Sequence, residues 1–95
     1  MKLGRIVGTV VSTRKDPSLA SLKLLIVEHV GPDLKSEGAY VIAVDSVGAG
    51  VGEVVLTASG SSARLTAQTR DKPVDAVIMG IVDNFDIDGR SVKLA

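Results

Sequence analysis

The chain has 95 residues with no cysteine, one histidine and a formal net charge of zero, from 11 basic and 11 acidic side chains. This composition excludes disulfides and thiolate metal sites, and one imidazole is too few for an ordinary zinc or copper centre. It also argues against binding to nucleic acid or an acidic membrane, because a neutral chain offers no positive surface to phosphate groups.

The length is that of one domain, which we expect to span residues 1–95. No apolar run reaches the roughly 18 residues that span a membrane. Residues 1–5 lack the long apolar core of a signal peptide. We therefore expect a cytoplasmic domain without metal or cofactor.

Two strands are expected in the first third of the chain. Residues 2–12 are rich in β-branched side chains and contain Gly4 and Gly8, where a strand bends or is approached closely. A polar loop follows at residues 13–18, since its Pro17 is excluded from central strands. Residues 22–30 (LKLLIVEHV) form the second strand, which is buried on both faces or lies between the core and an interface.

Two more strands flank a glycine-rich stretch in the middle of the chain. After a break at residues 31–33 and a charged loop at residues 34–38, strands are expected at residues 39–45 (AYVIAVD) and 53–58 (EVVLTA). Ser61 or Ser62 is positioned to cap a short helix over residues 63–66.

The last third begins with a polar loop at residues 68–72. The apolar run at residues 73–83 favours a strand, although a buried helix has a similar pattern. Asp88-Gly89 indicates a turn before a short final strand, which we expect to pair on an edge of this barrel or of a neighbour's. Five or six short strands and one short helix predict a mainly β fold, a small closed or nearly closed barrel.

Gly48, Gly50 and Gly52 occupy every second position of residues 48–52, which superficially suggests a dinucleotide-binding loop. Glu53 stands where that motif needs its third glycine, and a strand follows instead of a helix N-terminus. A tight turn between two strands is the favoured interpretation. The sharper alternative is a turn whose missing Cβ atoms let neighbouring subunits approach.

Catalytic candidates are few. Asp45 and Glu53 flank the glycine stretch and resemble a carboxylate pair, but no nucleophile or base accompanies them. His29 lies in an apolar strand, where a hydrogen-bonded core or interface histidine is the favoured interpretation. Arg64 suits an ion pair, with Asp75 or Glu53 as candidate partners, or hydrogen bonds to carbonyl groups; a solvated side chain remains open. We predict no catalytic residue.

The composition itself suggests association. The chain is 45% hydrophobic but only 2% aromatic, and a small domain cannot bury so much apolar surface in one core. The alternative function is a barrel that binds single-stranded nucleic acid. Such barrels use aromatic platforms and a basic groove, whereas Tyr40 and Phe85 are the only aromatic residues here.

Several pieces of the chain form one ordered pattern: residues 4–11 (GRIVGTVV), Thr13 with Lys15, residues 22–27 (LKLLIV), 43–56 (AVDSVGAGVGEVVL), 60–64 (GSSAR) and 73–83 (PVDAVIMGIVD). In this pattern nearly the whole chain resembles the pentameric vertex proteins of bacterial microcompartments, the EutN/CcmL family.

The resemblance implies an oligonucleotide-binding-like barrel that assembles into a five-fold ring. Such rings cap the vertices of an icosahedral shell made mainly of hexameric proteins, and they have no enzyme activity. We expect a subunit interface or five-fold axis at Gly48, Gly50, Gly52, Glu53, Ser61, Ser62, Arg64 and Asp75. We expect contacts to neighbouring shell tiles at Arg14 and Lys15.

Overall fold

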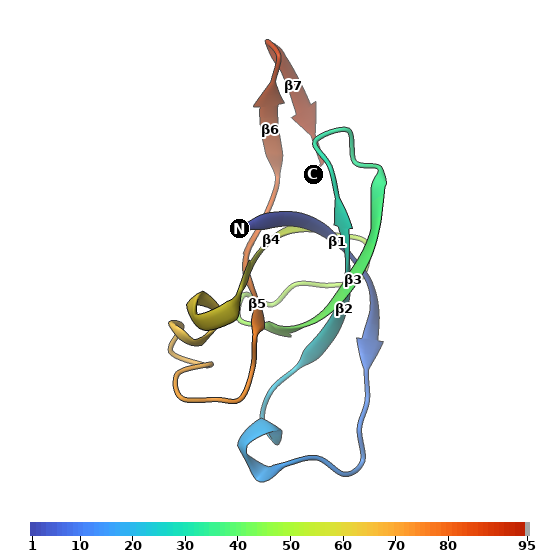
Figure 1. Cartoon of the computed structure of the whole chain (residues 1–95). Coiled ribbons are helices and arrows are strands. Elements are labelled where there is room, and N and C mark those ends of the chain that lie inside the picture. The colour runs from blue at the N-terminus through green and yellow to red at the C-terminus, as the bar shows by residue number, and fades with distance from the viewer. Residues whose placement is uncertain (95) are drawn as a thin grey trace.

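The computed structural model describes residues 1–94, and five strands of it close into a barrel (Figure 1). The barrel order is β1-β2-β3-β5-β4. The strands are β1 (Lys2–Val10), β2 (Leu24–Val30), β3 (Ser36–Asp45), β4 (Val54–Ser59) and β5 (Ala76–Ile81). The predicted small closed β-barrel is therefore confirmed.

The barrel interior is filled by aliphatic side chains from every strand. Because successive side chains of a strand point to opposite faces, each strand contributes alternate residues to the core. The most deeply buried large side chains include Ile6, Leu25, Val27, Val55 and Ile78.

Most strand pairs of the barrel are antiparallel, but β3 and β5 pair in parallel through Val44 with Val77 and Asp45 with Ile78. This parallel pair closes the barrel. β1 pairs with both β2 and β4, so Gly4 lies opposite His29 on one side and Val55 on the other. A Cβ atom at Gly4 would collide with the side chain of Val27, which explains the glycine at this crowded position.

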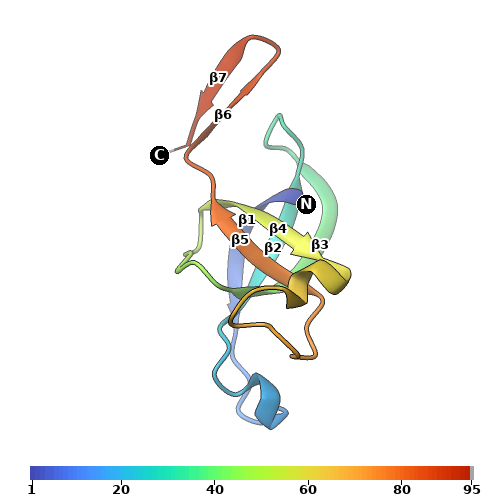
Figure 2. The same cartoon turned by 90° about the vertical axis from the view of Figure 1, so that its left-hand side faces the viewer.

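The chain ends in a hairpin that stands outside the barrel (Figure 2). It consists of β6 (Asn84–Ile87) and β7 (Arg90–Lys93), which form a separate two-stranded sheet. Asp88 and Gly89 have positive φ angles, as the predicted turn requires. The expectation that the final strand pairs with its own barrel was wrong, because β7 pairs with β6 instead.

Two short 3₁₀ helices interrupt the strands. The first, η1 (Pro17–Leu19), lies in the predicted polar loop and is capped by Asp16. The second, η2 (Gly60–Arg64), is the predicted short helix, but it begins earlier than expected. Ser61 and Ser62 therefore lie inside it, and the prediction that one of them caps it was wrong.

One other expectation needs correction, whereas the loop at residues 68–72 is present as expected. β3 begins at Ser36, inside the segment 34–38 that was expected to be a loop. Thr69, in the expected polar loop 68–72, is fully buried and exchanges hydrogen bonds with Thr66. Among residues 1–94, no helix is long and apolar enough to cross a bilayer.

Candidate functional site

The segment between β3 and β4, residues 46–53, is here called the glycine loop. It has no strand partner, yet Asp45 holds its first half in a defined shape. One oxygen of Asp45, Oδ1, accepts hydrogen bonds from the backbone N–H groups of Val47, Gly48 and Ala49, at 3.0, 3.1 and 3.2 Å. Three successive amides around one anion form a compact nest.

The other oxygen of Asp45 faces Lys23, just before β2. Lys23 Nζ lies 3.5 Å from Oδ2 and donates a 3.0 Å hydrogen bond to the carbonyl of Ala49. Burial raises the pKa of Asp45, but the hydrogen bonds from Val47 and Ala49 and the charge of Lys23 outweigh it and hold the pKa below its ordinary value. Asp45 is therefore charged at neutral pH.

The second half of the glycine loop is held by Glu53 and β1. Glu53 accepts a 2.6 Å hydrogen bond from the N–H of Gly50. Ile6 of β1 donates to the carbonyl of Glu53 at 3.0 Å and accepts from the N–H of Gly52 at 2.8 Å. Asp45 and Glu53 thus do not face each other as a catalytic pair, because each binds backbone amides of the loop.

The glycine loop buries one side chain and exposes the two valines on either side of it. Ala49 is buried and belongs to the barrel core cluster. Val47 and Val51 are exposed to 39% and 63%. We call Val47 and Val51, with the glycines between them, the loop surface.

The second predicted interface segment is η2. Gly60 donates a hydrogen bond to the carbonyl of Asp75 at 2.8 Å, and Arg64 Nη1 reaches the carbonyl of Val74 at 3.4 Å. Arg64 thus lies near Asp75 but bonds to the backbone carbonyl of Val74 and not to the carboxylate of Asp75. The predicted ion pair of Arg64 with Asp75 or Glu53 does not form, since Lys23–Asp45 is the one ion pair within residues 1–94.

β5 lies between the glycine loop and η2. Asp45, at the start of the loop, pairs with Ile78 on one side of β5, and Ser59, just before η2, pairs with Ala76 on the other. The exposed side chains of this region are Val47, Val51, Ser61, Ser62, Arg64, Leu65 and Met79. The two sequence motifs predicted to act together thus flank one strand.

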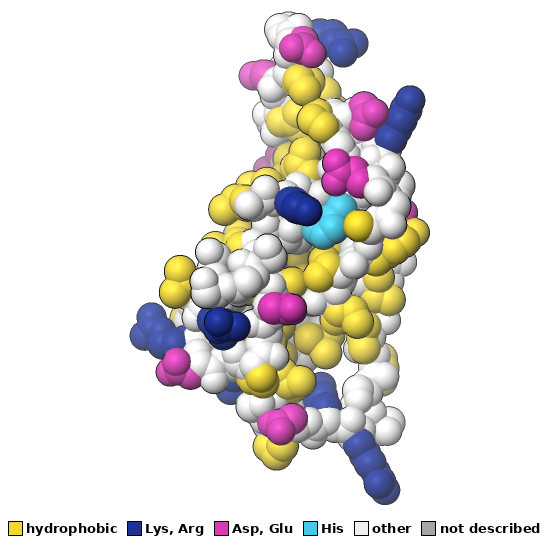
Figure 3. Space-filling model, in the orientation of Figure 1, with side chains coloured by type: hydrophobic (Ala, Val, Ile, Leu, Met, Phe, Trp, Pro, Cys, Tyr) yellow, Lys and Arg dark blue, Asp and Glu magenta, His cyan; other side chains and the backbone are white. Residues whose placement is uncertain are grey.

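A second apolar area covers the outer face of the sheet. Val7 of β1 and Tyr40 and Ile42 of β3 are exposed, and half-buried Ile26 of β2 pairs with Ile42. Figure 3 shows hydrophobic side chains gathered over β2 and β3. We call Val7, Ile26, Tyr40 and Ile42 the sheet surface. A hydrogen bond to Glu28 and the charge of that carboxylate raise the pKa of Tyr40.

Arg14 and Lys15 lie on the loop between β1 and β2. Both side chains are exposed. The carbonyl of Arg14 accepts a 2.7 Å hydrogen bond from Ser12 Oγ, which shapes the loop. Figure 1 places this loop at the end of the molecule opposite the β6–β7 hairpin.

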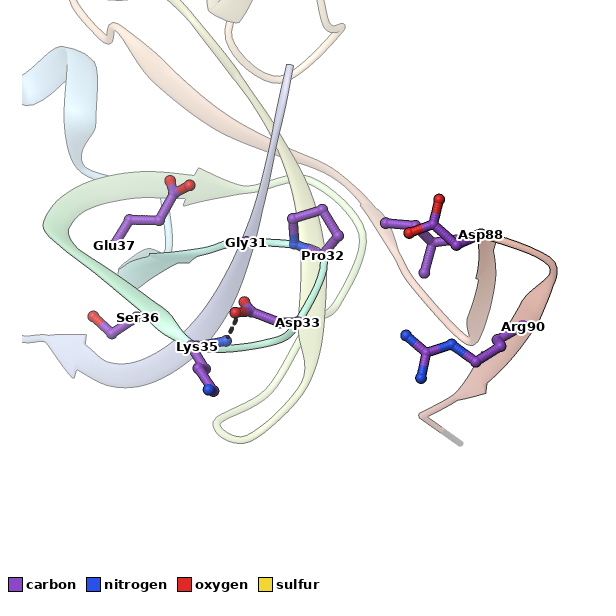
Figure 4. A pocket seen from close by; sticks show the side chains of 9 residues that line it. Gly31, Pro32, Asp33, Lys35, Ser36, Glu37, Asp88 and Arg90 are labelled. Carbon is purple, nitrogen blue, oxygen red and sulfur yellow. Dashed lines mark hydrogen bonds between the residues drawn. The ribbon is translucent and has the colours of Figure 1, made fainter.

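An open cavity of about 500 Å³ separates the hairpin from the turn between β2 and β3. Figure 4 shows Arg90 of β7 extending toward this turn, where Asp33 accepts the N–H of Lys35. The lining mixes charges of both signs, and Asp33 is already engaged with its own turn. The cavity shows no nucleophile with a base beside it.

The structure does not assemble the enzyme candidates. Asp45 lies beside Lys23 at one end of β2 and His29 lies near the other, about 20 Å away along an extended strand. His29 Nδ1 is shielded from solvent and has no hydrogen-bond partner within the subunit. The expectation of a satisfied core histidine was therefore wrong, and the interface histidine stays a prediction. Within residues 1–94, no three His, Cys, Asp or Glu side chains form a metal-ligand group.

Comparison with known proteins agrees with the motifs and the barrel. The family model described as ethanolamine utilisation protein EutN/carboxysome matches residues 1–83. The chain belongs to the EutN/CcmL family. The carboxysome shell vertex protein CcmL of Gloeobacter violaceus is 42% identical over 95% of this chain and 90% of its own.

Solved structures of EutN/CcmL proteins have the same fold. The CcmL structure from Nostoc superposes with a TM-score of 0.94 at 40% identity, over all of both chains. GrpN of Rhodospirillum rubrum, described as a pentameric microcompartment shell protein, gives 0.82 at 44% identity, over 92% of this chain and 98% of its own. Each of these relatives is named as a shell protein or as CcmL.

One residue of the site was not predicted from the sequence. Lys23 was treated as part of an apolar strand, whereas its side chain bridges Asp45 and Ala49. The sequence did contain a signal for this role. Lys23 is a single lysine within the apolar run LKLLIV, and such a side chain extends its ammonium group to water or to a polar partner.

Proposed function

We propose that this EutN/CcmL protein forms a closed ring of five subunits that caps the vertices of an icosahedral microcompartment shell. The ring is the assembly of its pentameric relative GrpN. Vertex placement follows the names of its relatives, which include shell vertex proteins of carboxysomes and other microcompartments. Five-fold units supply the curvature that a flat array of hexameric tiles lacks.

The observation that carries the proposal is the presence of two different exposed apolar surfaces on one small barrel. A ring needs a head-to-tail contact, in which one face of each subunit meets a different face of the next. The loop surface and the sheet surface lie on different elements and both expose aliphatic side chains. Monomeric proteins seldom expose apolar patches of this kind without a partner.

Within this ring, the loop surface and the η2 region face the neighbouring subunit or the five-fold axis. The residues concerned are those of the sequence prediction: Gly48, Gly50, Gly52, Glu53, Ser61, Ser62, Arg64 and Asp75. Their position on both sides of β5 supports one continuous contact. Glu53 and Asp75 help to fix the backbone of this contact, since the carbonyl group of each accepts a backbone hydrogen bond.

The partners beyond the ring are hexameric shell proteins. Arg14 and Lys15 form the contact to these tiles, because they are exposed cations on a loop at one end of the molecule. The ring has a structural role without catalysis. This agrees with a site whose two carboxylates are both committed to loop amides.

A barrel that binds single-stranded nucleic acid is less well supported. Such a barrel stacks bases on aromatic side chains within a basic groove. Tyr40, the exposed aromatic side chain of the barrel, pairs across β2 and β3 with Glu28, whose negative charge repels phosphate groups. The chain as a whole is neutral.

The test is the native mass of the purified chain at micromolar and lower concentration, by native mass spectrometry or light scattering. The expected result is one discrete species of five subunits that persists on dilution. A folded monomer at all concentrations would overturn the ring. Salt-dependent binding of that monomer to an oligonucleotide would favour the alternative function.

A further inference from the structure

We propose that Asp45 and Lys23 act as a positioning pair that locks the glycine loop in the shape required at the subunit interface. Asp45 is the last residue of β3, and Lys23 directly precedes β2. The inference rests on the proposed function, because it concerns how the loop surface is presented to a neighbouring subunit.

The glycine loop needs such a lock. It contains three glycines, and glycine loses more conformational freedom on folding than any other residue. Gly52 and Glu53 are bonded to Ile6 of β1, but Val47, Gly48 and Ala49 have no backbone bonds to a strand. Gly48 and Gly52 have φ angles of +77° and +94°, which glycine adopts easily. Glycine adopts negative φ angles about as easily, so the loop backbone has many alternative conformations. Without a fixed anchor the loop surface has no single shape to offer.

Asp45 is built to be that anchor. Its side chain is 3% exposed, whereas the Lys23 side chain that faces it is 56% exposed. The backbone amides therefore compensate the charge of Asp45 more than Lys23 does. The three amides at Oδ1 come from consecutive loop residues, which fixes the direction in which the chain leaves β3. Charge-assisted hydrogen bonds of this kind are stronger than those between neutral groups.

Lys23 closes the arrangement from the other side. Its ammonium group contacts Asp45 and the carbonyl of Ala49, while its own backbone carbonyl accepts the N–H of Asp45 at 2.9 Å. Lys23 therefore holds both the carboxylate and the loop residue whose side chain enters the core. The outward position of Val47 follows from this fixed point, whereas Glu53 and Ile6 hold the backbone on either side of Val51.

The experiment compares Asp45→Asn and Lys23→Met with the wild-type chain. Asparagine keeps the shape and one acceptor oxygen but loses the charge, and methionine keeps the aliphatic stem but loses the ammonium group. Asp16→Asn is the matched control, because Asp16 also accepts a loop N–H, from Ser18 at 2.9 Å, but in the distant 11–18 loop. Lys23→Arg tests whether another cation restores the function.

Two readouts are taken on each chain. Hydrogen exchange followed by mass spectrometry reports the order of residues 46–53, and native mass reports the ring. We expect exchange of the loop to be about ten- to a hundredfold faster in Asp45→Asn and Lys23→Met. We expect loss of the five-subunit species in both, with retention in Asp16→Asn and Lys23→Arg, while circular dichroism shows an intact barrel in all.

The outcomes separate this inference from the proposed function. Unchanged loop exchange in Asp45→Asn and Lys23→Met overturns the positioning pair, even if the wild type is a ring. If hydrogen exchange of the loop is faster but the amount of five-subunit ring is unchanged, the positioning pair has no role in assembly. A wild-type monomer overturns the proposed function, and faster exchange in the two variants would then still support the loop lock itself.

Discussion

At the residue scale, the three glycines of the glycine loop serve different purposes. Gly48 and Gly52 have positive φ angles, which side chains other than glycine rarely adopt, so the backbone itself requires them. Gly50 has no such angle, and a Cβ atom there would lie 3.5 Å from Glu53 Oε1, an ordinary contact. The subunit's own fold therefore does not explain Gly50, whereas the close neighbouring subunit of the proposed ring would.

This difference makes Gly50→Val the informative substitution. We expect a folded chain that no longer forms rings, because two added methyl groups keep the neighbouring subunit from the loop surface. The measurements are native mass and circular dichroism. Ala20→Val is the control, since it enlarges an exposed side chain that lies outside the glycine loop, η2, β5 and the sheet surface.

Unchanged five-subunit rings in Gly50→Val would remove the glycine loop from the interface. Gly52→Val is expected to behave differently from Gly50→Val. It should destabilise the subunit itself by about 1 kcal/mol or more, because it forces a β-branched residue to positive φ.

Residue identities were predictable where they follow from backbone chemistry. The glycine turn at residues 48–52 and the Asp88-Gly89 turn are both explained by positive φ. The partners of charged side chains were not predictable, because they depend on which segments the barrel brings together. Lys23 and Asp45 come from different strands, and only the closed sheet places one beside the other.

At the element scale, the loop between β1 and β2 provides a test of the tile contact. We expect Arg14→Glu combined with Lys15→Glu to leave the ring intact, since both side chains are exposed. The incorporation of rings into shells, measured after co-expression with hexameric shell proteins, should fall at least severalfold. The reason is that the charge of the two side chains at the contact is reversed. The amount of vertex protein in purified shells is the measurement.

A matched pair controls for charge alone. Arg70→Glu with Lys72→Glu makes the same change of charge on the loop before β5, and it should leave incorporation unaltered. Equal incorporation of the Arg14 and Lys15 variant and the wild type would exclude this loop as the tile contact.

The β6–β7 hairpin is an element that the barrel does not need. The five barrel strands close without it, and the family model ends at Asp83, just before β6. We expect a chain of residues 1–83 to retain the barrel. Its free energy of unfolding should fall by about 1–2 kcal/mol, from the loss of half-buried Leu94 and its hydrogen bond to Asp83.

Urea unfolding followed by circular dichroism measures this difference, with both chains at one subunit concentration because assembly couples stability to concentration. An unfolded 1–83 chain would show instead that the hairpin belongs to the folding unit of the barrel.

Elements were predicted well where apolar alternation or a turn signal was present. The strands of the barrel and the final turn follow from such patterns, whereas β3 extends back to Ser36 through polar residues that pair only because β2 lies beside them. The end strand was misplaced for a related reason. Its sequence indicates a strand and a turn but does not reveal which edge is free.

At the scale of the whole molecule, composition was the most useful guide. A surplus of aliphatic residues with few aromatics suggested association, and the structure exposes that surplus on two elements as the loop surface and the sheet surface. The positions of these surfaces were not predictable, because they depend on barrel closure by the parallel pair of β3 and β5.

The filled interior of the barrel has a consequence for permeability. Ile6, Leu25, Val27, Val55 and Ile78 are each at most 1% exposed, and they leave no water-filled path along the barrel axis. Metabolites therefore cannot cross a vertex through an individual subunit. In the proposed ring, exchange at a five-fold corner must run along the symmetry axis or between subunits. If the glycine loop faces that axis as proposed, its side chains and not those of the barrel core set the width and polarity of the opening.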